Sequence, residues 1–171
     1  MRHEGARAGA SWPWVLLALL PLAAVAAALI SQHRFGMLPC PWCVLQRLIF
    51  VAMAVVALPG LLVRHPLVRR VSAFEVLTLA LAGLAAALWQ HFVAAGSSSC
   101  NLTLADRINT AIGLDSLWPE VFAAYATCAD AAVKLLGLPY EFWSGTLFVA
   151  LGGLAVLALR QALNTPMRAG R

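Results

Sequence analysis

Two cysteines separated by two residues, Cys40 and Cys43, are the side chains of this sequence best suited to chemistry. A Cys-x-x-Cys pair forms a small disulfide that exchanges readily, and a helix N-terminus and a nearby cation stabilise a thiolate at its second cysteine. A long apolar run follows Cys43, and Arg47 lies four residues after it. The spacing therefore predicts a redox-active disulfide at the start of a helix, with Arg47 as the cation.

Two other interpretations of the Cys40 and Cys43 pair are weaker. A zinc site needs about four ligands of suitable geometry, and the remaining cysteines, Cys100 and Cys128, lack a second paired spacing. A structural bridge across two residues gains little, because the stabilisation by a disulfide grows with the length of the loop that it closes.

Cys100 and Cys128 form the second candidate pair. A bridge between them would close a long loop and stabilise it by roughly 3 kcal/mol, so a structural disulfide is a serious alternative. We favour a second exchangeable disulfide, because glycine and three serines precede Cys100 and predict an accessible segment. Four cysteines allow three pairings, and the residues alone do not choose among them.

Arg47 and His91 are the candidate residues for binding an electron acceptor. An arginine one turn into a membrane helix is costly unless it snorkels to the headgroups or has a partner. The functional alternative is that Arg47 stabilises the Cys43 thiolate and donates hydrogen bonds to a carbonyl-bearing acceptor in the membrane. His91, at the end of a later apolar run, is either a plain interfacial histidine or a donor and proton relay beside that acceptor.

The composition predicts an all-α integral membrane protein. Of the 171 residues, 62% are hydrophobic and 11% are charged, against roughly 25% charged in average soluble proteins. We expect one domain over 1–171, a bundle of four transmembrane helices at about 13–31, 43–63, 71–92 and 142–161. We do not expect a nucleic-acid partner, because outside the apolar runs no basic cluster carries interleaved aromatic residues.

The segments between these helices are expected to be two loops on one side and a short basic turn on the other. The loops cover about 32–42 and 93–141, and the second carries a short amphipathic surface helix near 117–125, with Pro119 in its first turn. The first apolar run could also be a signal peptide. Its length and the lack of a clear cleavage site favour a retained helix.

The arginines and lysines predict the orientation in the membrane. Eight of the twelve lie in the N-terminal segment, the 64–70 turn and the C-terminal segment, and four lie on the other side: Arg34, Arg47, Arg107 and Lys134. This bias places both termini in the cytoplasm (segments 1–12, 64–70 and 162–171). All four cysteines then face the oxidising side of the membrane.

The chain resembles the bacterial DsbB family in several motifs together. These are the Cys-x-x-Cys that opens the second helix, Gln46-Arg47 behind it, Leu88-Trp89-Gln90-His91 at the end of the third, a distant cysteine pair, and the stretches 118–122, 128–130 and 138–143. The resemblance covers about 13–159. It implies an inner-membrane thiol oxidase that reoxidises a periplasmic DsbA-like thioredoxin-fold protein and passes the electrons to ubiquinone or menaquinone.

The resemblance also implies roles for individual residues. Cys100 would be attacked by the thiolate of the partner, Cys128 would then exchange with Cys40, and Cys43 would be released as a thiolate beside the quinone. Arg47 and His91 would lie near the quinone ring. Membrane lipid is the other expected partner.

Three alternatives stay open at this point. One is a DsbB paralogue dedicated to another partner. Another is an enzyme like vitamin K epoxide reductase, although there the Cys-x-x-Cys follows the loop cysteines, whereas here it precedes them. The third is a non-enzymatic membrane scaffold whose disulfides are structural.

Overall fold

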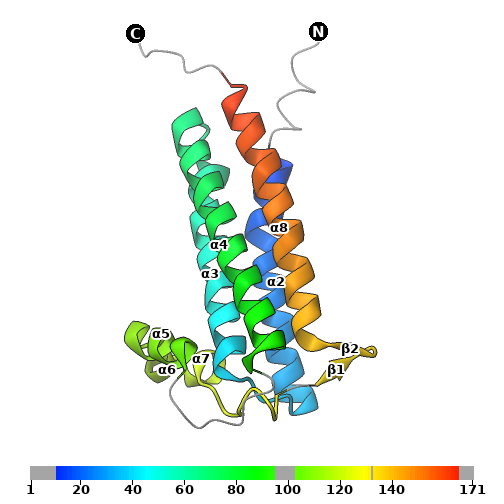
Figure 1. The fold of residues 1–171 in the computed structure, drawn as a ribbon. Helices are drawn as coiled ribbons and strands as arrows, with labels where there is room; N and C mark the ends of the chain where they lie inside the picture. Colours follow the sequence, from blue (N-terminus) through cyan, green and yellow to red (C-terminus); the bar gives the residue numbers. More distant parts are fainter. Residues whose placement is uncertain (1–10, 95–102, 132, 166–171) are drawn as a thin grey trace.

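The computed structural model describes residues 11–94, 103–131 and 133–165. In this part of the chain, four helices are long and apolar enough to cross a membrane: α2 (Trp12–Phe35), α3 (Pro41–Leu62), α4 (Pro66–Phe92) and α8 (Tyr140–Leu163). Their 22 to 27 residues correspond to about 33–40 Å, which exceeds the roughly 30 Å of a bilayer core. They lie side by side in an up-and-down bundle (Figure 1). The predicted all-α fold of four transmembrane helices is confirmed.

The outer surface of the bundle is apolar. Large hydrophobic side chains on all four helices are exposed, among them Leu19, Val55, Leu81 and Val149. In water such a surface would cause aggregation, but lipid tails cover it without cost.

Small residues allow the helices to approach closely. Helix α4 packs most extensively against α8 and next against α3, and alanines of both α4 and α8 are fully buried, including Ala73 and Ala155. The ring of Phe148 lies directly on Gly83, where a Cβ atom would overlap it, and stacks on Phe50 with the centroids 4.2 Å apart. Small residues at helix contacts are characteristic of membrane bundles, where van der Waals packing drives association.

The helix ends differ from the expected ones by a few residues. Helices α3 and α4 begin at Pro41 and Pro66 rather than near residues 43 and 71, because each proline occupies the first turn, where its missing N–H costs nothing. Helix α2 continues to Phe35 rather than to residue 31, and it ends at Gly36, whose φ of +65° suits glycine.

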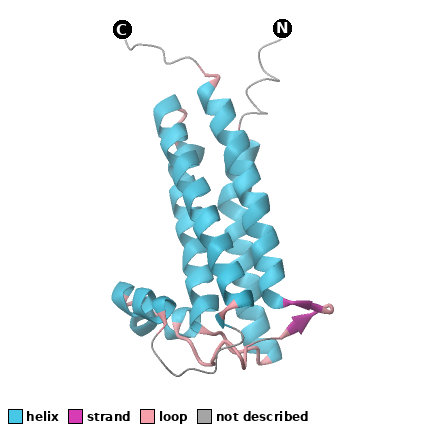
Figure 2. Ribbon diagram, in the orientation of Figure 1, coloured by secondary structure: helices cyan, strands magenta, loops and turns pink. Residues whose placement is uncertain are grey.

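At the end of the bundle where α3 begins, the second loop folds into small elements (Figure 2). They are α5 (Leu104–Ile112), α6 (Leu114–Leu117), α7 (Pro119–Phe122) and a hairpin of β1 (Lys134–Leu135) and β2 (Leu138–Pro139). The expected surface helix near 117–125 is interrupted at Trp118, and from Ala123 the chain is extended. Leu136 and Gly137 both have positive φ at the turn of the hairpin, which a two-residue turn of this hand requires.

The opposite end of the bundle is held by arginines. The expected basic turn at 64–70 is helical from Pro66 onward, so Arg69 and Arg70 belong to the first turns of α4. Arg70 donates hydrogen bonds to the carbonyls of Ala162, Leu163 and Thr165. A cation is favourable here, because the last carbonyls of α8 have no partner within the helix.

Candidate functional site

The Cys-x-x-Cys pair forms the first turn of α3. Cys40 is the N-cap residue, and its Sγ accepts a hydrogen bond of 3.3 Å from the backbone N–H of Cys43. The two Sγ atoms are 2.8 Å apart. Cys40 is fully buried, while Cys43 is partly accessible. The two-residue spacing thus places both sulfurs at a helix N-terminus, where free N–H groups favour negative charge.

The second loop is anchored to the residues beside Cys40. The backbone N–H groups of Tyr125 and Ala126 donate to the carbonyl of Pro39, at 2.9 and 3.3 Å. From α5, the side-chain amide of Asn109 donates to the carbonyl of Pro41 at 3.0 Å. These bonds hold the loop against the start of α3.

This anchoring places Cys128 on the sulfur of Cys40. The two thiols are hydrogen-bonded, and the backbone N–H of Trp42 also donates to the Cys128 sulfur. The hydrogen bond with Cys128, followed by that with Cys43 and by burial, raises the pKa of the Cys40 thiol far above its ordinary value. The bond with Cys40 lowers the pKa of the Cys128 thiol. Of the two thiols, Cys128 is therefore the more acidic, and Cys40 is the donor in the hydrogen bond between them.

Cys100, the expected first point of contact with a partner, lies outside the described residues. The structure therefore brings together three of the four candidate cysteines.

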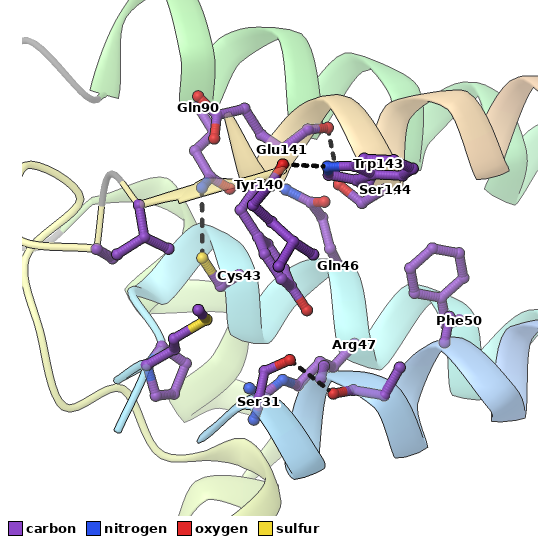
Figure 3. A pocket seen from close by; sticks show the side chains of 18 of the residues that line it. Ser31, Cys43, Gln46, Arg47, Phe50, Gln90, Tyr140, Glu141, Trp143 and Ser144 are labelled. Carbon is purple, nitrogen blue, oxygen red and sulfur yellow. Dashed lines mark hydrogen bonds between the residues drawn. The ribbon is translucent and has the colours of Figure 1, made fainter. Parts of the chain in front are cut away.

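A cavity of about 310 Å³ opens beside Cys43, between α2, α3 and α8 (Figure 3). The side chains of Cys43, Gln46 and Arg47 line it from α3. Much of the remaining wall is apolar: Ala24, Ala27, Ala28, Met37, Leu38, Pro39, Phe50, Ala131, Val133, Leu135, Trp143 and Leu147. Ser31, Gln90, Tyr140, Glu141 and Ser144 add polar groups. The cavity suits a flat, largely apolar molecule with a few hydrogen-bond acceptors.

Arg47 is buried at this cavity, with 6% of its surface exposed. Its Nη1 donates to the side-chain oxygen of Gln32 at 2.7 Å and to the carbonyl of Val121 at 3.0 Å. Arg47 thus does not snorkel to the surface, because it has partners on α2 and α7. Both of these bonds use Nη1, whereas a guanidinium carries five N–H donors on three nitrogens. Among the described residues, no hydrogen bond uses Nε or Nη2, so their donors are candidates for holding a ligand in the cavity.

Two glutamines connect α3 and α4 at Cys43. The Gln46 side-chain amide donates to the Oε1 of Gln90 at 2.7 Å, and the Nε2 of Gln90 donates to the Cys43 Sγ at 3.3 Å. Both side chains are buried, with 5% and 4% of their surfaces exposed. Figure 3 shows Gln90 directed at the sulfur.

His91 does not line the cavity, but its partner does. Its Nδ1 lies 2.8 Å from a carboxylate oxygen of Glu141, which is buried and forms part of the cavity wall. His91 thus reaches the cavity wall through Glu141, and its place beside an electron acceptor stays a prediction.

The sequence interpretation missed the roles of Gln32, Gln90 and Glu141. Each is a polar residue within or next to an apolar run. A buried polar side chain in a membrane helix requires a partner, and this was the signal available in the sequence. The identity of each partner depends on how the helices pack.

Comparison with known proteins gives consistent matches. The sequence model of the family "Disulfide bond formation protein DsbB" matches residues 10–158. Disulfide bond formation protein B of Nitrosomonas europaea is 29% identical over 86% of this chain and 92% of its own length. Disulfide bond formation protein B 1 of Pseudomonas syringae pv. syringae is 35% identical over 79% of this chain and 80% of its own. Disulfide bond formation protein B 1 of Pseudomonas putida is 31% identical over 85% of this chain and 87% of its own length.

Proposed function

The chain belongs to the DsbB family of disulfide-forming oxidoreductases of the bacterial inner membrane, and on that premise we propose that it oxidises a DsbA-like periplasmic protein and reduces a membrane quinone. One observation carries this proposal. The Cys43 sulfur faces a largely apolar cavity at the membrane end of the site, while the Cys40 sulfur contacts Cys128 from the loop. The pair therefore has one sulfur directed at each of two electron-transfer partners.

The proposed chemistry begins with thiol–disulfide exchange. A thiolate of the reduced partner attacks Cys100, which is bridged to Cys128, and the Cys128 thiolate leaves. It then attacks Cys40, so that a Cys40–Cys128 bond forms and the Cys40–Cys43 bond breaks. Cys43 leaves as a thiolate, and no electrons are gained or lost within the chain.

The cavity residues fit a quinone. Arg47 would hold a ring carbonyl through its remaining N–H groups, and Tyr140 adds a hydroxyl to the cavity wall. The alanines of α2 and Phe50 would contact the ring and the start of an isoprenoid tail. A bound ubiquinone or menaquinone would supply the acceptor for the two electrons and two protons that are released when the Cys40 and Cys43 thiols form their disulfide again.

An acceptor of this kind is required on energetic grounds. DsbA is a strong oxidant at roughly −120 mV, whereas ordinary structural disulfides lie below about −300 mV. If the Cys40–Cys43 disulfide were as stable as an ordinary structural disulfide, oxidation of DsbA by it would be unfavourable by roughly 8 kcal/mol, since ~30 mV corresponds to about 1.4 kcal/mol for two electrons. The helix N-terminus and the buried Arg47 stabilise the thiolate product and make this pair more oxidising.

The orientation proposed from the charges places the cysteine-bearing end of the bundle in the periplasm. The start of α2 and the end of α8 lie at the opposite end (Figure 1), so both would be cytoplasmic. Cys40 and Cys128 would then lie on the periplasmic side of the membrane.

A two-signal assay tests the proposal. The purified protein in detergent is mixed with ubiquinone and a reduced DsbA-type protein, and quinone absorbance and free thiols are followed together. We expect equal losses of quinone and thiol pairs, abolished in Cys43→Ser and in Cys100→Ser. If neither signal changes while both disulfides stay intact, the scaffold alternative holds. Normal quinone reduction by Cys43→Ser would refute the proposed mechanism.

A further inference from the structure

Besides the Cys40 thiol, whose Sγ lies 2.8 Å away, the side-chain donor in contact with the Cys43 sulfur is the amide of Gln90 rather than the guanidinium of Arg47. Gln90 Nε2 lies 3.3 Å from the Cys43 Sγ, within the range for a bond to sulfur. Hydrogen bonds of Arg47 run instead to Gln32 and to the carbonyl of Val121. The guanidinium therefore acts on Cys43 through space, whereas Gln90 acts by direct contact.

The orientation of the Gln90 amide is fixed by a second glutamine. An amide can present either its N–H₂ donor or its C=O acceptor to a neighbour. Gln46 Nε2 donates to Gln90 Oε1 at 2.7 Å, which leaves the N–H₂ of Gln90 for the sulfur. Gln46 lies three residues after Cys43, so both are on the same face of α3 and contact the same side chain of α4.

Burial makes this contact strong. Gln46 and Gln90 are both about 95% buried, so little water competes for these hydrogen bonds. In such surroundings, a donor aimed at an anion contributes more than it would in water. A disulfide sulfur is a weak acceptor, so the donor favours the thiolate over the disulfide.

We propose that Gln90 stabilises the Cys43 thiolate directly, that Gln46 is the residue that positions it, and that the two together raise the reduction potential of the Cys40–Cys43 pair. The inference rests on the proposed function, because only a Cys43 that is released as a thiolate benefits from this donor. It gives Gln46, besides Cys40, Cys43 and Arg47, a task in the same reaction.

The test uses the equilibrium with glutathione in a Cys100→Ala, Cys128→Ala background. Two glutathione thiols reduce the Cys40–Cys43 disulfide and become glutathione disulfide. Cys40 takes up one of the two protons, and the other goes to solvent because Cys43 remains a thiolate. The fraction of reduced pair, measured by alkylation and mass spectrometry at fixed pH, gives the equilibrium constant.

Gln90→Met keeps the length of the side chain and removes its donor. We expect the equilibrium constant for reduction to fall about tenfold, the effect of losing one hydrogen bond to a charged group, which equals about 30 mV for a two-electron couple. Gln46→Met should also lower the equilibrium constant for reduction, but by a smaller factor. Gln161→Met, in the last turn of α8 far from the sulfurs, is the matched control and should leave it unchanged.

A second measurement separates this role from a merely structural one. In a variant whose single cysteine is Cys43, Gln90→Met should slow alkylation of Cys43 at neutral pH, because only the thiolate reacts. A purely structural bond between α3 and α4 would lower the melting temperature and leave both the equilibrium and this rate unchanged. That result would overturn the proposal.

Failure of the proposed function is distinguishable from failure of this inference. No quinone takes part in either measurement, so a protein that never reduces quinone can still show the Gln90 effect. Conversely, normal quinone reduction combined with an unshifted equilibrium in a folded Gln90→Met would refute the role of Gln90 alone.

Discussion

At the level of single residues, the hydrogen bond between Cys40 and Cys128 determines which of these two sulfurs is reactive. It raises the pKa of the buried Cys40 and lowers that of Cys128. In the reduced protein, the pH profile for alkylation of Cys128 should therefore lie at lower pH than that of an ordinary thiol. Cys40→Ala removes the donor and should move the profile to higher pH, so that alkylation at neutral pH slows. Peptide mapping by mass spectrometry after timed alkylation gives the profile.

The matched control variant should shift the pH profile of Cys128 alkylation in the opposite direction. Charge on Cys43 raises the pKa of Cys128, so Cys43→Ala should move the Cys128 profile to lower pH. Profiles that move in the same direction in both variants would contradict the assignment of the proton to Cys40.

Arg47 is expected to affect the use of quinone more than the binding of the protein partner. Arg47→Met removes a buried cation from the cavity wall and should raise the apparent KM for ubiquinone about tenfold, the effect of losing one charge-assisted hydrogen bond. The KM for a DsbA-type protein should change little. Steady-state kinetics with each substrate varied in turn measures both. Arg34→Met, an exposed arginine at the end of α2, is the control, and an unchanged quinone KM in Arg47→Met would remove this role.

The sequence indicated the reactive residue types, but it could not show which of them touch. The contact between Cys40 and Cys43 could be predicted, because the two residues are close in the sequence. The contact between Cys40 and Cys128 depends on two loop N–H groups bound to Pro39, and no side-chain pattern encodes those bonds. Gln90 and Gln46 both belong to the motifs of the resemblance, but their contact could not be predicted because they lie on different helices.

At the level of the elements, Gly83 determines how closely α4 approaches α8. A Cβ atom at this position would overlap the ring of Phe148. Gly83→Ala should therefore displace the ring from its stack on Phe50 and destabilise the bundle by about 1–3 kcal/mol. Gly153→Ala is the control, because a Cβ there meets nothing within 4 Å, and it should be neutral or stabilising by up to about 1 kcal/mol. Thermal unfolding in detergent compares the two, and equal melting temperatures would contradict the packing argument.

The four long helices could be predicted from the sequence, because runs of about twenty apolar residues are unambiguous. The small helix α5 was missed, although Thr103 and Asp106 form a capping box at its start. Its nine residues are too few to be stable alone. It exists through contacts such as that of Asn109 with Pro41, which the sequence does not reveal.

At the level of the whole molecule, the fold separates a chemically active end from an inert one. The sulfurs, the cavity and the loop elements gather where α3 begins and α4 ends, and the remaining length of the bundle is packed alanine, leucine and phenylalanine. A buried charge such as Arg47 is tolerated only at the active end, where α7 supplies a carbonyl for it. The long helices thus serve mainly to hold one end of the bundle at the membrane surface.

Which side of the membrane this end faces depends on charges that lie mostly outside the bundle. Among the described residues, arginines and lysines are balanced, with Arg64, Arg69, Arg70 and Arg160 at one end and Arg34, Arg47, Arg107 and Lys134 at the other. The excess comes from the terminal segments, which carry Arg2, Arg7, Arg168 and Arg171. By the positive-inside rule, both termini are therefore expected in the cytoplasm.

Single cysteines in a variant without the native four test this orientation. On intact spheroplasts, a membrane-impermeant maleimide should label Lys134→Cys, in the exposed hairpin, and should not label His65→Cys, in the exposed turn between α3 and α4. Both should be labelled after the membrane is opened, which controls for reactivity. The reverse pattern would place the cysteines of the native chain in the reducing cytoplasm, where a disulfide donor has no oxidising compartment to serve.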